Sequence, residues 1–346
     1  MINMKNKKID AVVLWVDGND PKWQEERKQY KIAKADEQGN PSSCFRDYDL
    51  LEFFFRGIEK NMPWINNVFF ITWGHLPKFL DTKNPRLKIV NHKDFIPKEY
   101  LPTYNSNVIE LNLHRIKELS ENFILFNDDM YVIDELKEEM FFKNDLVCDS
   151  LFSRTMVNYV YGHQIYYTVF NNMSLVNKHF YGHKPFTKWI NPKYPIKENI
   201  SNAVNRLTKR YSSFENQHVA LAHKKSTFEE VWKEEGDVLD KMCHNKFRTA
   251  YDFSHWLMRY WRFAKGDFNP INVGDIGFYT DVNWNIDDLV DIVVNKKEKI
   301  FLLNDSSEES EEDFIVHRQK IYDAFSKILP EKSSFELDSK IKENIE

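Results

Sequence analysis

Four short apolar runs, each ended by a cluster of polar residues, limit this chain to few folds. The runs are rich in β-branched and aromatic residues and cover residues 10–16, 68–72, 87–90 and 122–126. Such runs are typical of buried strands. Longer segments with helical spacing lie between them. Because strands that alternate with helices pair in parallel through right-handed crossovers, the sequence predicts an α/β fold with a mostly parallel, Rossmann-like sheet and flanking helices.

The helical patterns are clearest after the first strand and in the second half of the chain. Asp49 and Glu52 form a predicted capping box for a helix that Pro63 ends, and Ser106 is the predicted cap of a helix with Ile109, Leu113 and Ile116 on its apolar side. Further helices are expected within residues 23–39, 250–264 and 313–329, and a late strand at 300–303. We therefore expect an α/β half at 1–150, an aromatic and basic, mainly helical insertion at 151–270, and a C-terminal segment at 271–346 that completes the core.

Composition excludes several classes of protein. The 346 residues are 42% hydrophobic and 15% aromatic, which excludes a disordered or low-complexity chain. A net charge of -5 gives no general attraction to nucleic acid. Three widely spaced cysteines argue against a disulfide framework, and no apolar run approaches the roughly 18 residues of a membrane span. The expectation is a cytoplasmic protein without a nucleic-acid partner.

Polar residues follow each predicted strand. They are Asp17, Trp73 to His75, His92 and Asn127 to Asp129. Because ligands bind beyond the carboxyl ends of the strands of an open parallel sheet, these residues are expected at one rim. The adjacent carboxylates of Asp128 and Asp129 suit Mg2+ held beside phosphate oxygens, although such a pair also commonly caps a turn.

Two further groups are candidates for acid–base or phosphate chemistry. Glu110 and His114 lie four residues apart and share a predicted helix face with Asn107, so the carboxylate can orient a general base. His183 and Arg248 can supply positive charge to a migrating phosphoryl group. The alternatives are a solvated helix face for the first group and structural ion pairs for the second. Since no P-loop, dinucleotide, serine-hydrolase or zincin motif is present, the residues alone indicate a metal-assisted reaction on a phosphorylated ligand.

Two stretches of the chain carry a familiar pattern of residues: 9–21, and a longer stretch from Phe45-Arg46-Asp47 through residues 101–106, 108–116 and 126–129. They resemble the first and second blocks of the Stealth family of bacterial capsular polysaccharide phosphotransferases, which are related to animal N-acetylglucosamine-1-phosphotransferase. The resemblance to the second block is the closer one. Weaker similarity surrounds 183–185, 247–257 and 301–305, and 330–336 resembles the closing segment. The chain departs from the family at Trp73-Gly74-His75 and at residues 186–188, so we expect differences in donor or acceptor recognition more than in activity.

The resemblance implies transfer of a hexose or N-acetylhexosamine 1-phosphate from a nucleotide sugar, expected to be a UDP-sugar, to a hydroxyl of an oligo- or polysaccharide acceptor. It implies that residues 1–150 bind the nucleotide sugar, that 151–270 contact acceptor and phosphate, and that 271–346 complete the catalytic core. The implied catalytic residues are Asp128, Asp129, His114, Glu110, His183 and Arg248. Mg2+ or Mn2+ is expected on Asp128, Asp129 and Asp305. The implied substrate-binding residues are Asp17, Gly18, Arg46, Asp47, Gly74, Asn105, Ser106, Arg115, Asn127 and Asn304.

Two other functions remain open at this point. One is a metal-dependent glycosyltransferase of polysaccharide synthesis, which attacks the anomeric carbon in place of phosphorus. The other is a noncatalytic glycan-assembly protein. The resemblance is also compatible with work at the inner face of the bacterial membrane, beside a polysaccharide-assembly complex.

Overall fold

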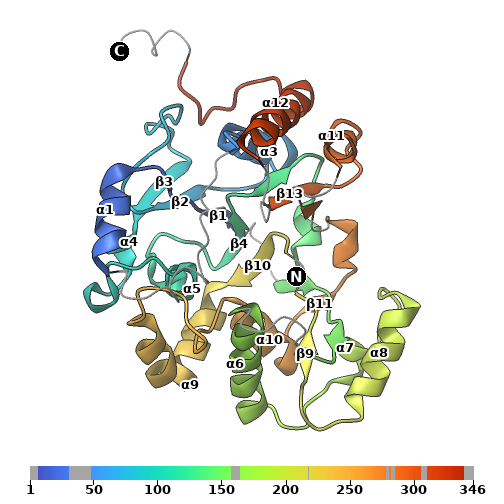
Figure 1. Cartoon of the computed structure of the whole chain (residues 1–346). Helices are drawn as coiled ribbons and strands as arrows, with labels where there is room; N and C mark the ends of the chain where they lie inside the picture. Colours follow the sequence, from blue (N-terminus) through green and yellow to red (C-terminus); the bar gives the residue numbers. More distant parts are fainter. Residues whose placement is uncertain are drawn as a thin grey trace.

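The structure is a computed structural model, and it describes residues 7–30, 48–156, 164–216, 218–277, 280–281, 285–304 and 310–338. Its centre is a five-stranded sheet in the order β10-β4-β1-β2-β3 (Figure 1). The strands are β1 (Ile9–Leu14), β2 (Val68–Thr72), β3 (Leu87–Asn91), β4 (Asn122–Asn127) and β10 (Leu221–Lys224). The first four are parallel and β10 is antiparallel to β4. The predicted mostly parallel α/β sheet is confirmed.

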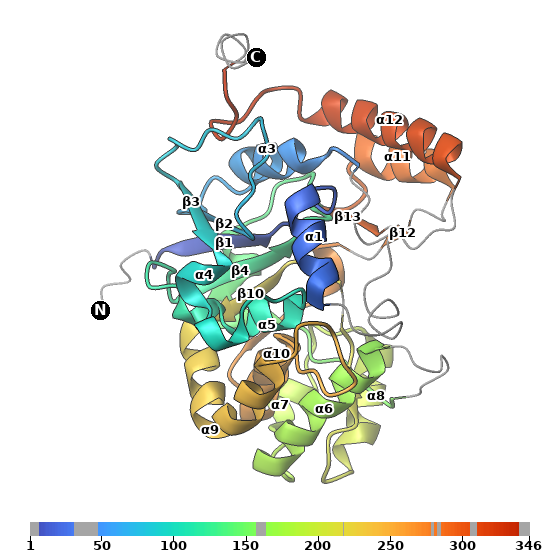
Figure 2. The same cartoon turned by 60° about the vertical axis from the view of Figure 1, so that its left-hand side comes forward.

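The strands of this sheet are apolar on both faces because helices cover both. Val12 of β1 belongs to one buried cluster, whereas its neighbours Ala11 and Val13 belong to the other. This alternation follows from the two-residue period of a strand. One face is covered by α3 (Leu51–Asn61) and α12 (Glu311–Ile328), and the other by α5 (Ser106–Leu111), α9 (Lys225–Cys243) and α10 (Trp256–Lys265) (Figures 1 and 2).

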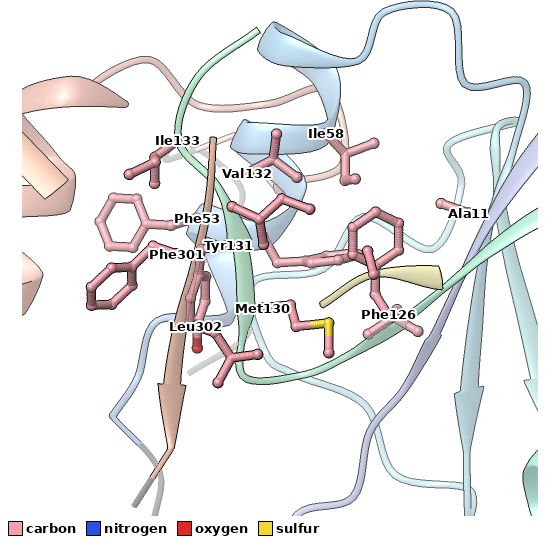
Figure 3. Packing of buried hydrophobic residues seen from close by; sticks show 14 of the residues in the cluster. Ala11, Phe53, Ile58, Phe126, Met130, Tyr131, Val132, Ile133, Phe301 and Leu302 are labelled. Carbon is pink, nitrogen blue, oxygen red and sulfur yellow. The ribbon is translucent and has the colours of Figure 1, made fainter. Parts of the chain in front are cut away.

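A second, smaller sheet extends the α3 side of the core. It joins β5 (Met130–Val132), β13 (Ile300–Asn304) and the short β12 (Thr280–Asp281). Figure 3 shows Phe53 and Ile58 of α3 beside Val132 of β5, with Phe301 and Leu302 of β13 in the same cluster. The pairing of β13 with β5 brings the C-terminal part of the chain to the residues that directly follow Asp129.

The segment between residues 151 and 270 is mainly helical, as predicted. It contains α6 (Gln164–His179), α7 (Phe186–Trp189) and α8 (Ile196–Arg206) in addition to α9 and α10. Short strands border this segment and lie within it. Before it, β6 (Phe142–Lys143) pairs with β7 (Leu146–Asp149), which also pairs with β11 (Asn269–Pro270) at its end; within it, β8 (Ser153–Arg154) pairs with β9 (Ser213–Phe214). The segment also donates β10 to the central sheet, so it is not spatially separate from the first half. The three-part division of the chain remains a prediction.

Several predicted boundaries differ from the structure. The predicted helix beginning at Ser106 ends at Leu111, and a separate 3-10 turn covers Leu113–Arg115. The N-cap of α5 is Asn105, whose side-chain oxygen accepts a hydrogen bond from the backbone N–H of Asn107. The helix stops because the side chain of Asn112 donates to the carbonyl of Val108. The prediction of one continuous helix was therefore wrong.

The capping box predicted at Asp49 and Glu52 is also wrong. Leu50 is the residue that precedes α3, without a side-chain cap, and Asp49 has a positive φ of 53°. Glu52 instead accepts a hydrogen bond from Arg56, at 3.2 Å, and another from Tyr322 of α12. The acidic side chain thus ties two helices together, and does not close a helix end.

The remaining helices lie close to their predicted positions. The helix α1 (Pro21–Tyr30) occupies the first part of the segment predicted at 23–39, whose remainder lies outside the described residues. The helix α12 matches the predicted 313–329 within two residues, and α10 starts six residues later than predicted. Within the part of the chain that the structure describes, no helix has both the length and the apolar character needed to cross a membrane.

Candidate active site

The carboxyl ends of the four parallel strands meet at one rim of the sheet. In the register, Leu14 of β1 lies beside both Asn127 of β4 and Ile71 of β2, and Thr72 lies beside Asn91 of β3. The polar residues that follow these strands are therefore neighbours in space, as the sequence predicts. This rim is where an open parallel sheet binds its ligands.

His75 connects two of the loops at the rim. Its Nε2 atom accepts a hydrogen bond from the backbone N–H of Asp17 at 2.7 Å, and its Nδ1 atom lies 3.5 Å from a carboxylate oxygen of Asp20. Burial lowers the pKa of His75, and the two nearby aspartates oppose that shift. The neutral ring that accepts from Asp17 fixes the loop after β1, which contains the buried Gly18. Gly74, with a φ of 146°, forms the turn before His75.

A group of six residues, the His218 cluster, lies beside the end of β4. Its members are Asn127, His218, His255, Glu110, Arg248 and Ser106. The side-chain amide of Asn127 lies 2.9 Å from Nε2 of His218. His255, directly before α10, interacts electrostatically with His218 and lies 4.0 Å from the carboxylate of Glu110. The cluster thus combines the sheet, α5 and the helical segment.

Arg248 is attached to the cluster through α5. Its Nη2 atom donates to the hydroxyl of Ser106 at 2.7 Å, and its charge acts on Glu110. The Nε atom of Arg248 is buried and makes no hydrogen bond among the described residues. A guanidinium with one donor unused and a planar fork is well suited to phosphate oxygens.

The titratable groups of the cluster have shifted pKa values. Burial raises the pKa of Glu110 to about 7, against the opposing effects of Arg248, the backbone N–H of His255 and the hydroxyl of Ser106. Burial lowers the pKa of His218 to about 4 and that of His255 to about 3. Both imidazoles are therefore neutral at physiological pH, and perturbed groups gathered at a strand rim are characteristic of a functional site.

Asp128 and Asp129 form the turn that leaves β4. Asp128 is exposed, whereas one carboxylate oxygen of Asp129 is buried and has no hydrogen-bond partner among the described residues. Burial raises the pKa of Asp129 to about 7. The backbone N–H of Leu303 donates to the carbonyl of Asp129 at 3.0 Å, so the backbone of Asn304, at the end of β13, also approaches this turn.

The predicted third metal ligand, Asp305, lies outside the described residues, as do the predicted substrate contacts Arg46 and Asp47. In the described part of the chain no three His, Cys, Asp or Glu side chains gather as a metal site. The acidic turn and the unpartnered oxygen of Asp129 nevertheless fit a hard cation, which prefers carboxylate oxygens.

Asn105 supports the site from within the protein. Its side chain is completely buried, and its amide donates to Asp252 at 2.7 Å. Asp252 also accepts from Asn107 and Thr249. These bonds hold the start of α5 against the loop that carries Arg248, so Asn105 positions the residues that line the site.

Three predicted site residues, His114, Arg115 and His183, lie outside the His218 cluster. His114 packs against Phe228 and Trp232 of α9 instead of facing Glu110, and burial lowers its pKa to about 4. Arg115 is exposed, with its guanidinium 4.8 Å from the centre of the Trp232 ring. The shared polar face predicted for Asn107, Glu110 and His114 is absent because α5 ends between the last two.

His183 lies at the opposite end of α10 from His255. Its Nδ1 atom is 2.6 Å from the carbonyl of Ala264. At 1.5 Å per residue, the nine positions between His255 and Ala264 correspond to about 14 Å along the helix. The structure therefore does not bring His183 to the His218 cluster.

The sequence reasoning missed His218, His223 and His255. His223, on β10, is fully buried and lies 3.1 Å from Nδ1 of His255. One signal was available: Val219 to Ala222 is a short apolar run flanked by two histidines, and its second half forms the first half of β10. The run predicts a short strand with a histidine near each end, but it does not predict the pairing with β4.

The same reasoning missed a buried charge network beneath α10. Arg259 donates to both carboxylate oxygens of Asp149, and Arg262 lies 3.6 Å from the same carboxylate. All three side chains are buried. A buried ion pair that loses one member is strongly destabilised, so this network fixes the helix whose first turn follows His255.

The comparisons with known proteins show which family the chain belongs to. Stealth conserved region 1 matches residues 7–35, which include all of β1. Stealth conserved region 2 matches residues 44–149, which include all of β4 and α5. The chain is 42% identical to a capsular polysaccharide phosphotransferase WcwK of Streptococcus pneumoniae, over 95% of this chain and 98% of that protein.

Two more distant relatives are similar over nearly the same length. Receptor polysaccharide phosphotransferase WefC of Streptococcus gordonii is 32% identical over 96% of this chain and 99% of its own. Exopolysaccharide phosphotransferase cps2G of Lactiplantibacillus plantarum is 32% identical over 95% of this chain and 96% of its own. On these matches, the chain belongs to the Stealth family, together with these polysaccharide phosphotransferases.

Proposed function

We propose that this protein is a sugar-1-phosphate transferase of bacterial capsular or cell-surface polysaccharide synthesis. It moves hexose or N-acetylhexosamine 1-phosphate from a nucleotide sugar, with a UDP-sugar as the first donor to test, to a hydroxyl of an acceptor sugar. The products are a phosphodiester and a nucleoside monophosphate. Family membership supports the phosphotransferase activity and the polysaccharide acceptor.

The observation that carries the proposal is the position of His218 beside Asn127, directly before the acidic turn, with Arg248 in the same His218 cluster. Arg248 is held by Ser106 and has an unused donor. In phosphoryl transfer, negative charge must be neutralised by groups already in place. Arg248 therefore contacts the transferred phosphate in this account, with Glu110 and Asn105 behind it as positioning residues.

His218 is the proposed general base. Because the amide of Asn127 donates to its Nε2 atom, the ring proton of the neutral form lies on Nδ1. The neutral form is the one that accepts a proton, and the negative charge of a bound diphosphate favours that acceptance. The acceptor hydroxyl then displaces Asn127 from Nε2 as it enters the site.

Asp128 and Asp129, with Asp305, are the proposed ligands of Mg2+ or Mn2+. The buried, unpartnered oxygen of Asp129 supports this assignment, as does the approach of β13 to the same turn. When bound, such a cation neutralises the negative charge of the donor diphosphate.

The rest of the rim is the proposed nucleotide-sugar site. Asp17, Gly18 and Gly74 belong to the loops joined by His75. These loops adjoin Asn127 through the strand register, so a donor bound across them presents its diphosphate to the acidic turn. We place the reaction in the cytoplasm at the inner face of the membrane, beside the polysaccharide-assembly complex.

A phosphorus NMR experiment tests the proposal. Protein, Mg2+, a panel of nucleotide sugars and short glycan acceptors should give a new phosphodiester resonance that requires acceptor. Asp128→Asn should abolish it, whereas Asp275→Asn, at another exposed aspartate, should not. Turnover without a phosphodiester product would favour the glycosyltransferase alternative. A folded protein with no turnover on any donor would favour the noncatalytic one.

A further inference from the structure

The helix α8 is attached to the protein by its polar side. In most surface helices the apolar stripe faces the core, but here Glu198 and Asn202 are the buried residues. The amide of Asn202 donates to the carbonyls of Leu151 and Trp189 at 2.7 and 2.8 Å, and its oxygen accepts from the backbone of Ser153. Glu198 pairs with Arg154 at 2.5 Å. These bonds fix the orientation of the helix.

The opposite side of α8 is apolar and exposed. Ile196, Ile200, Val204 and Leu207 are 81, 61, 61 and 86% exposed. Their spacings of four, four and three residues place them on one face, which continues past the last turn of the helix. Single exposed apolar residues are ordinary, but a continuous row of them indicates an interaction surface.

The surroundings of this row are strongly basic. Residues 181–210 contain seven Lys or Arg, of which five are exposed, and one acidic residue, the buried Glu198, although the whole chain carries a net charge of -5. The same segment has two exposed aromatic rings, each in contact with a guanidinium near the end of α8: Arg206 is 5.2 Å from the centre of the Phe186 ring, and Arg210 is 5.1 Å from that of Tyr181. The surface therefore combines apolar, aromatic and cationic groups, like an interfacial membrane helix.

We propose that this surface, the α8 face, docks on an anionic lipid bilayer, with the helix lying in the plane of the interface. The positive charge around the α8 face favours a lipid bilayer over a second copy of the chain, because Lys and Arg are attracted to acidic headgroups. In a symmetric pair of copies the same basic patch would meet itself and repel. The inference deepens the membrane placement in the proposed function and rests on it. In Figures 1 and 2 the helix lies at the end of the molecule away from α12, so it is free to contact a flat surface.

Vesicle sedimentation of the full-length protein tests this surface. Wild type should bind vesicles of equal parts phosphatidylcholine and phosphatidylglycerol, but not phosphatidylcholine alone, and salt should weaken the binding. The variant Ile200→Gln/Val204→Gln/Leu207→Gln should bind at least about tenfold more weakly, because it removes three inserted apolar side chains. The control Ile315→Gln/Val316→Gln, on the similarly exposed face of α12, should bind like wild type.

Three results would overturn the docking surface: no binding of wild type to anionic vesicles, equal binding of wild type and the α8 variant, or a dimer that only the α8 variant loses. Turnover of water-soluble donor and acceptor separates this proposal from the proposed function. Wild type and both variants should react equally fast without vesicles. If vesicle binding behaves as expected and none of the proteins reacts, the enzymatic proposal fails and the docking surface stands.

Discussion

The side-chain amide of Asn127 donates to Nε2 of His218 across 2.9 Å, and this bond joins two segments that are 91 residues apart. Asn127 ends β4, and His218 lies three residues before β10, which pairs with β4. The antiparallel strand therefore delivers a histidine to the rim where the four parallel strands end. The helical segment and the sheet contribute to one site.

A comparison of two histidines tests this arrangement. His218→Gln should lower kcat by about 100-fold or more, the usual contribution of a general base. His114→Gln should leave kcat of the folded enzyme nearly unchanged, because that ring packs against α9. Steady-state kinetics with circular dichroism as the folding control measures both. A larger kcat loss at His114 than at His218 would contradict the site as assembled here.

Two arginines provide a second comparison. Arg248→Gln should reduce kcat/KM by about 100-fold, since it removes a fixed cation from the phosphate. Arg115→Gln should change kcat/KM by less than about threefold, because the side chain is exposed and stacks on Trp232. Equal losses of kcat/KM for the two variants would contradict the proposed contact between Arg248 and the transferred phosphate.

The buried carboxyl of Glu110 makes the free energy of unfolding of the protein depend on pH. Its pKa is raised to about 7 from an ordinary value of 4.5, so the folded protein holds this proton more tightly than the unfolded chain. The resulting stabilisation is complete below pH 4.5 and is lost as the pH rises to about 7. Glu110→Gln has no such proton to lose.

Urea unfolding of wild type and Glu110→Gln at pH 5 and pH 8 measures the effect. The variant should gain stability relative to wild type as the pH rises, by up to about 3 kcal/mol over the interval between the two pKa values. A difference in unfolding free energy between wild type and Glu110→Gln that stays constant from pH 5 to pH 8 would contradict the prediction. It would show that Glu110 is ionised in the folded protein at both pH values.

Much of the fold follows from local sequence. The runs at β1 to β4 are apolar enough to require burial on both faces, and their polar ends identify the rim. Local sequence could not place β10, because it pairs with β4 from nearly 100 residues away and that contact is set by tertiary packing. For the same reason His218 and His255 were missed.

The errors around α5 have a local physical cause. A periodic apolar pattern continues through Ile116, but the side chain of Asn112 binds the carbonyl of Val108 and the helix stops there. This competition between side chain and backbone is characteristic of asparagine. It moved His114 and Arg115 away from Glu110, and hydrophobic periodicity does not report it.

A glycine in α3 limits how the core can change. A Cβ atom added at Gly57 would lie 2.4 Å from the carbonyl oxygen of Val132, a backbone atom of β5. Gly57→Ala should therefore destabilise the protein by about 1–3 kcal/mol or more. Gly236→Ala in α9 has open space around the new methyl group, and should be neutral or stabilising by up to about 1 kcal/mol. Thermal unfolding measures both, and equal melting temperatures would refute the predicted contact.

The central claim is that the acceptor attacks phosphorus, and the identity of the released nucleotide tests it most directly. Purified protein is incubated with Mg2+, a UDP-sugar panel and glycan acceptors, and the released nucleotide is identified by chromatography. Acceptor-dependent release of UMP is the predicted result, because cleavage within the diphosphate leaves one phosphate on uridine. Release of UDP would mean attack at the anomeric carbon and would contradict the mechanism.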